Sequence, residues 1–288
     1  MTRIAVSLPR TLALPSARRL VREPGYLLAI LVIAVVLAWV VAPGLFTSID
    51  PLATDAVNKF QPPSFAHPFG TDYIGRDIFA RVVHGSALSL QATTLALVLA
   101  FAASAVIGLL AGFVGGALDS ILMRIVDVFL AVPGLLISLL LITALGFGML
   151  NIAIAVAVGS VASFSRVMRA EVMRVSASPF VEAARANGVR WPSILIAHVL
   201  PHARGPVLSL IALEFGAAIL SIASLSFLGF GVALPEPEWG SLVAEGRSYL
   251  GTAWWLTLLP GAVVVVVVLA ANRISRGIGR NSLGRNER

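Results

Sequence analysis

Residues 182–201 read EAARANGVRWPSILIAHVLP, a stretch in which arginines, one glycine and two prolines are spaced among small and apolar residues. The chain around it is very different, because 58% of its 288 residues are hydrophobic and only 12% are charged. A soluble domain is usually about one quarter charged. The composition therefore indicates an integral membrane protein, in which this polar stretch has to lie outside the bilayer.

The stretch and the residues before it carry helix start and stop signals. Ser178-Pro179 is a favourable helix start, with Ser as the N-cap and Pro at the first helical position. Gly188 is typical of a left-handed helix end. A second short helix is expected to begin near Pro192 and to end at Pro201. The sequence thus predicts an elbow of two short helices between membrane spans.

Six apolar segments are long enough to cross a hydrocarbon core, which takes roughly 20 residues. They cover residues 27–46, 85–118, 121–145, 151–169, 207–228 and 252–271, and the third is expected to bend near Pro133. Arginines precede the first segment as they would in a signal peptide, but its length favours a retained helix. The predicted fold class is an all-α membrane protein with six transmembrane helices.

The distribution of charge predicts the orientation, because Lys and Arg are enriched in cytoplasmic loops. Arginine is in excess before the first span, between the fourth and fifth spans, and after the last span. The segment between the first and second spans and the loop between the fifth and sixth spans are more acidic. Both termini and the elbow are therefore expected in the cytoplasm. The predicted organisation is a cytoplasmic tail (1–26), a first transmembrane helix (27–46), an extracytoplasmic segment (47–84), a five-helix core (85–272) with a cytoplasmic loop at about 176–206, and a basic tail (273–288).

Several function classes find no support in the sequence. The chain has no cysteine, and its four histidines show no ligand-like grouping, so no metal site is expected. No GxxxxGK[ST] phosphate-binding loop and no catalytic Ser/His/Asp arrangement occurs. The net charge of +7 follows from the orientation pattern and predicts no nucleic-acid partner. The chain is expected to bind no cofactor and to catalyse no reaction itself.

The elbow resembles the EAA loop of ABC-importer permeases, in which EAA is followed by three residues, Gly, nine residues, Ile, one residue and Leu-Pro. The matching positions are Glu182, Ala183, Ala184, Gly188, Leu200 and Pro201. His198 takes the place of Ile, as in many peptide-type permeases, and His202 stands where those members usually have Asn. The resemblance implies that these residues form a coupling helix that couples the permease to an ATPase.

Further segments resemble permeases of dipeptide, oligopeptide and nickel importers, of the second-subunit kind. They are residues 67–90, 124–136 and 224–261, and the likeness extends over about 26–272. Ser275-Arg276 departs from the Gly-Asp that often follows the last span in peptide-type members. The resemblance implies a type I ABC importer permease fold in the bacterial cytoplasmic (inner) membrane.

The same resemblance implies partners and a function. The partners are a second permease subunit, two ATP-binding subunits that carry ATP and Mg, an extracytoplasmic solute-binding protein and membrane lipid. The implied function is half of the translocation path for di- and oligopeptides. Import of nickel or another small solute is the alternative, and a motor-independent secondary transporter is a further one, although no inverted repeat is evident. A membrane-embedded enzyme is a third, for which no paired acid and base are found.

Charged residues within the apolar segments are candidates for a translocation path. Asp127 lies three residues after Arg124, a spacing that predicts an ion pair on one helix face, and a proton relay is the alternative. Glu214 in the fifth span has no partner nearby in the sequence, which makes it the better path candidate, unless it reaches water at the cytoplasmic boundary.

Polar residues near the outer ends of the spans have two interpretations. Asp72 and Asp77 can cap helices or pair with Arg76 and Arg81, or they can form a gate or contact a binding protein. Glu236, Glu238 and Trp239 lie in a proline-stiffened loop. There Trp239 is expected to anchor at the membrane interface, and the acidic charges to receive a binding protein.

Overall fold

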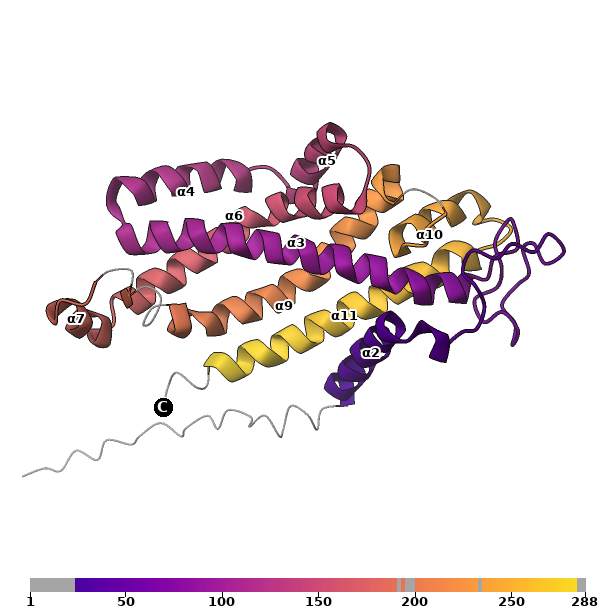
Figure 1. The fold of residues 1–288 in the computed structure, drawn as a ribbon, viewed down its shortest axis with the longest axis horizontal. Helices are drawn as coiled ribbons and strands as arrows, with labels where there is room; N and C mark the ends of the chain where they lie inside the picture. The colour runs from indigo at the N-terminus through magenta and orange to yellow at the C-terminus, as the bar shows by residue number, and fades with distance from the viewer. Residues whose placement is uncertain (1–23, 191–192, 195–199, 233–234, 284–288) are drawn as a thin grey trace, which may run out of the picture.

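The computed structural model describes residues 24–190, 193–194, 200–232 and 235–283, and over these residues it is helical with no strand (Figure 1). The membrane-spanning part contains α2 (Pro24–Val41), α3 (Ile78–Val114), α4 (Gly116–Leu130), α5 (Gly134–Leu145), α6 (Met149–Ser176), α9 (Leu200–Leu225) and α11 (Trp255–Leu283). The shorter elements are η1 (Pro43–Leu45), α7 (Pro179–Ala186), η3 (Ser226–Phe230), α10 (Trp239–Gly246) and η4 (Arg247–Tyr249).

Five helices are long and apolar enough to cross a membrane, and the pair α4–α5 supplies a sixth span if the two are counted together. This pair is bent by 88° at residues 131–133, so the predicted bend near Pro133 is confirmed. The second span begins earlier than predicted, at Ile78. Asp77 starts it there, because its carboxylate accepts a hydrogen bond from the Ala80 amide at 2.6 Å.

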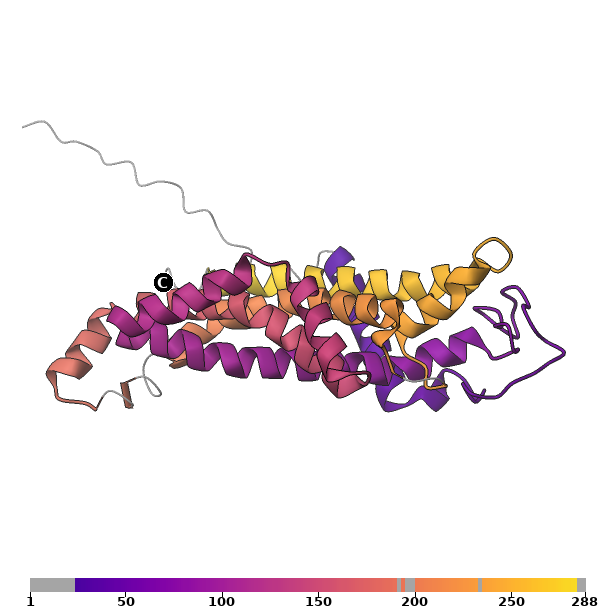
Figure 2. The same cartoon turned by 90° about the horizontal axis from the view of Figure 1, so that it is seen from above.

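The long helices α3, α6, α9 and α11 run side by side, and α7 and the segment 46–77 lie at opposite ends of the bundle (Figures 1 and 2). Small residues allow the close packing of α3 on α6. A methyl group at Gly108 would lie 2.5 Å from Cβ of Met168, and one at Gly112 would lie 2.8 Å from the Arg169 carbonyl oxygen. This is the small-xxx-small spacing by which membrane helices approach each other.

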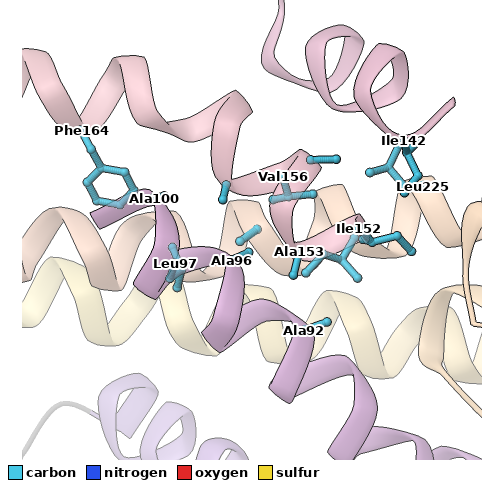
Figure 3. Close-up of a cluster of buried hydrophobic side chains, with 14 residues drawn as sticks. Ala92, Ala96, Leu97, Ala100, Ile142, Ile152, Ala153, Val156, Phe164 and Leu225 are labelled. Carbon is cyan, nitrogen blue, oxygen red and sulfur yellow. The ribbon is translucent and has the colours of Figure 1, made fainter. Parts of the chain in front are cut away.

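The core between these helices is built from small and branched apolar side chains. Figure 3 shows Ala92, Ala96 and Ala100 of α3 facing Ala153 and Val156 of α6. Ile142 of α5 and Leu225 of α9 lie next to each other in the same cluster. The cluster joins four helices, so a displacement of α6 reaches α3, α5 and α9 through direct contacts.

One predicted helix end and one predicted loop end are wrong. Pro201 does not end a helix but lies in the first turn of α9, where its missing N–H leaves no bond unmade. Trp239 does not end a loop but begins α10, an unpredicted helix. Most of the predicted second elbow helix, near Pro192, lies outside the described residues.

Candidate functional site

The elbow follows directly on α6, because only Ala177 and Ser178 separate Ser176 from the start of α7. The Ser178 carbonyl accepts hydrogen bonds from the amides of Val181 and Glu182. Its hydroxyl donates backwards to the Val175 carbonyl. Ser178 thus stands at the predicted helix start, but its side chain completes the end of α6 rather than capping α7.

One face of α7 holds the elbow on the bundle and the other is exposed. Val181 and Ala184 are buried against the C-terminal part of α6, in one cluster with Met168 and Val172. Glu182 and Ala183 are exposed. The EAA residues therefore divide between the two faces, two offered to solvent and one packed inward.

Gly188 ends the elbow helix in the predicted left-handed conformation, with φ of +74°. The Asn187 amide donates to the Ala183 carbonyl, and the Val189 amide donates to that of Ala184. This pattern closes the last turn of α7. Leu200 and Pro201 lie at the start of α9, and their side chains are outside what the structure describes.

Two ion pairs join α6 to α4 above the elbow. The Arg169 guanidinium donates to both carboxylate oxygens of Asp119, at 2.5 and 2.6 Å. Arg166 donates to Asp127 at 2.6 Å. The predicted pairing of Asp127 with Arg124 is therefore wrong, since its partner lies on the neighbouring helix and Arg124 is exposed on α4. Asp127 does form an ion pair, as predicted, but with a different arginine.

Glu214 is half-buried in α9. The described part of the chain offers its carboxylate no hydrogen bond or ion pair. Two residues further along, Gly216 faces α11, where a methyl group would lie 2.9 Å from Oδ1 of Asn272. Glu214 remains a candidate for the path.

A network of four charges lies at the end of the bundle opposite α7 (Figure 1), with Asp72, Arg76 and Arg81 buried and Glu245 largely so. Arg76 donates to Asp72 at 2.6 Å and to Glu245 at 2.7 Å. Arg81 donates to the same two carboxylates, at 3.3 Å to Asp72 and at 3.0 and 2.9 Å to Glu245. Burial acts against the charged form of Arg76, but the hydrogen bond and charge of Asp72 and the charge of Glu245 outweigh it, so its pKa is raised.

The network shows which groups the polar residues of this end contact. Asp72 pairs with Arg76 and Arg81, and Asp77 caps α3 and contacts His67 at 2.8 Å. All but His67 are buried, so in this structure none of these aspartates and arginines offers a surface to another protein. The predicted helix cap and ion pairs are confirmed, and a role of these residues in a gate stays a prediction.

The loop before α10 is also turned inward. Glu238 caps α10 through the amides of Gly240 and Ser241 and accepts a hydrogen bond from Ser89. The Trp239 indole donates to the Val82 carbonyl at 3.0 Å and is fully buried. The interface anchor predicted at Trp239 is therefore wrong. Glu236 is exposed, as a contact residue has to be.

Sequence reasoning missed Glu245, which closes the charge network. No local pattern marks it, because Arg76 and Arg81 lie more than 160 positions away. It also missed the exposed apolar side chains of the outer segment, Val57 and Phe65. No group of three or more His, Asp or Glu side chains among the described residues is placed to hold a metal ion.

Comparisons with known proteins identify a family and several relatives that match most of the chain. Residues 104–281, which include the elbow, match the family described as binding-protein-dependent transport system inner membrane component. The chain is 38% identical to the dipeptide transport system permease protein DppC of Alkalihalophilus pseudofirmus, over 86% of this chain and 82% of the relative. It is 36% identical to the probable D,D-dipeptide transport system permease protein DdpC of Escherichia coli K12, over 87% and 84%.

Two solved structures have a similar fold. One is an inward-facing MetNI methionine ABC transporter, with a TM-score of 0.54 at 17% identity over 69% of this chain and 96% of that one. The other is an amino acid ABC transporter with histidines, with a TM-score of 0.55 at 18% identity over 70% and 94%. At these identities the likeness concerns the fold.

Proposed function

We infer that this chain, which belongs to the family of binding-protein-dependent transport system inner membrane components, is the permease subunit of an ATP-driven importer of di- and oligopeptides. The family and the apolar helices make it a multi-pass inner-membrane protein. Peptides are favoured over nickel as substrate because the relatives at 38% and 36% identity are named as dipeptide permeases.

The elbow is the observation that carries the proposal. An exposed short helix with Glu182 and Ala183 outward is suited to a groove of an ATP-binding subunit. Its inner side is packed on α6 through Val181 and Ala184, and α6 is clamped to α4 by two ion pairs. A push on α7 is therefore delivered to the helices that surround the core.

The proposed assembly contains a second permease subunit, two ATP-binding subunits, which hold ATP and Mg, and an extracytoplasmic binding protein. The charge pattern supports cytoplasmic N- and C-termini. In this orientation the outer segment faces the binding protein. Its exposed residues Asp55, Val57 and Phe65, together with Glu236, replace the buried charges as the candidate contact surface.

Co-purification tests the proposal. The tagged chain is expressed from its own operon, solubilised mildly, and its partners are identified by mass spectrometry. We expect a second permease and ATP-binding subunits, with the ATP-binding subunits lost in Glu182→Arg. Glu236→Arg, at the opposite end of the molecule, is the matched control and should keep them. Recovery of the chain alone, transporting in liposomes without ATP, would refute the importer and direct attention to Glu214.

A further inference from the structure

The break between α4 and α5 exposes polar backbone within a membrane-spanning part of the chain. Figure 1 shows α4 running along the bundle and α5 turned across it. No residue in the described ranges donates a hydrogen bond to the carbonyls of Ala131 and Val132. Pro133 follows with no N–H of its own, and residues 131–133 are exposed. Irregular backbone is tolerated at membrane depth only where protein or water covers it.

Contacts with α6 place the break at hydrocarbon depth. A methyl group at Gly134 would lie 3.0 Å from the Gly159 carbonyl, so the start of α5 is pressed on α6 there. Gly159 is ten residues from Met149 and seventeen from Ser176, the two ends of α6. At 1.5 Å per residue these separations are about 15 Å and about 25 Å. Lipid tails are therefore the wrong environment for these carbonyls.

A second, independent feature lies close to the break along the chain. Asp127, in the last turn of α4, pairs with Arg166 of α6, and the two side chains are 52% and 58% exposed. Charged side chains within spanning segments generally face the bundle interior or a water-filled cavity. Asp127 is four residues from Ala131 and five from Val132, so the ion pair and the unpaired carbonyls are close along the chain and one polar environment can serve both.

We propose that this surface, formed by the Asp127–Arg166 pair and the carbonyls of Ala131 and Val132, lines the water-filled path and binds the peptide in transit. The inference rests on the proposed function and names the site at which this chain contacts its substrate. A short peptide is a zwitterion whose amides donate hydrogen bonds. The two carbonyls accept from those amides, Arg166 receives the terminal carboxylate, and Asp127 receives the terminal ammonium group.

Such a site recognises features that all short peptides share. The two backbone carbonyls and the Asp127–Arg166 pair contact the backbone and termini of the peptide, and not its side chains. The flanking Leu135 and Leu136 are exposed and provide apolar contact without a fixed shape. The site therefore suits a permease that passes peptides of different sequence.

Cysteine labelling in the whole importer tests the site. The chain has no cysteine, so Val132→Cys introduces its only thiol. Val265→Cys on α11 is the matched control, since Val265 is 56% exposed and Val132 is 43% exposed. The complex is reconstituted in liposomes with its binding protein, treated with a charged, membrane-impermeant thiol reagent, and labelling of this chain is followed by mass.

We expect Val132→Cys to react about tenfold or more faster than Val265→Cys, because a thiolate forms only where water reaches the sulfur. Di-alanine, supplied with ATP and the binding protein, should slow the reaction of Val132→Cys several-fold. Equal rates for the two variants, or a fast rate that di-alanine leaves unchanged, would overturn the site. Failure of the unsubstituted complex to take up di-alanine would instead contradict the proposed function.

Discussion

Arg81 in α3 and Glu245 in α10 form two hydrogen bonds, of 3.0 and 2.9 Å, across 164 positions of the sequence. Arg76 and Asp72 complete the group, so two positive and two negative charges are buried together. Because Arg76 and Asp72 belong to the outer segment, the network ties that segment, α3 and α10 into one unit. The outer end of the molecule is thus held by electrostatics as well as by apolar packing.

Removing the charge of Glu245 should destabilise the protein strongly. Glu245→Gln leaves two guanidinium groups with the single carboxylate of Asp72. An uncompensated buried charge of this kind costs about 3–5 kcal/mol. Thermal unfolding of the purified protein in detergent measures the effect as a lower Tm.

Glu236→Gln is the control, because Glu236 is exposed and its substitution should change stability by about 0.5 kcal/mol or less. The double variant Arg81→Met with Glu245→Leu removes one charge of each sign and keeps the Arg76–Asp72 pair. It should be more stable than Glu245→Gln alone. Equal Tm values for Glu245→Gln and the control would contradict a buried network.

What the sequence predicts well is what depends on neighbouring residues. The apolar runs determine the spans, Pro133 determines the bend, and Asp77 caps the helix that begins beside it. The left-handed Gly188 follows from the same local chemistry. These features need no knowledge of how the helices pack.

What depends on packing is missed. The partner of Asp127 is Arg166, 39 positions away, although Arg124 has the better local spacing. Trp239 has the composition of an interface anchor but is buried, because α10 folds back onto α3 and its indole reaches the Val82 carbonyl. Glu245 carries no signal at all without the fold. The partners of charged and aromatic side chains are determined by tertiary contacts, which the spacing of residues along the sequence does not reveal.

The outer segment depends on a glycine at position 75. Gly75 has φ of +86°, and a methyl group there would lie 1.8 Å from the Asp55 carbonyl oxygen. Gly75→Ala should therefore open the segment 46–77 and make it sensitive to added protease. Gly115→Ala is the control, with φ of +70° but open space around the position, and it should cost only about 1–2 kcal/mol of backbone strain. Equal protease resistance of both variants would refute the close contact.

The packing of α3 on α6 depends on Gly108. A side chain there would press on Met168, so Gly108→Val should cost about 1–3 kcal/mol through overpacking. Gly44→Ala, which meets nothing within 4 Å and has no positive φ, should leave Tm unchanged. Tm in detergent gives the comparison. A Gly108→Val protein as stable as Gly44→Ala would mean that the two helices are not in close contact.

The indole hydrogen bond of Trp239 should be measurable on its own. Trp239→Phe keeps most of the apolar volume and removes the indole hydrogen bond, while the Val82 carbonyl keeps its bond within α3, so the cost should be about 0.5–1.5 kcal/mol. Trp254→Phe, at a half-exposed position, should change stability by about 0.5 kcal/mol or less. The difference in Tm between the two variants isolates the bond, and its absence would contradict the buried position of Trp239.

Gly188 should matter for coupling through its backbone alone. A methyl group at this position would meet nothing within 4 Å, so a substitution causes no clash and only the φ of +74° is at stake. A β-branched residue is strained there by about 1–3 kcal/mol, whereas Asn adopts this region readily. Gly188→Val should therefore displace the end of α7, lose peptide uptake and leave the ATP hydrolysis of the assembled complex running. Gly188→Asn should keep uptake near the unsubstituted level. Uptake and hydrolysis are measured in parallel on the same liposomes, and normal uptake by Gly188→Val would show that the elbow tolerates a different helix end and does not couple in the manner inferred.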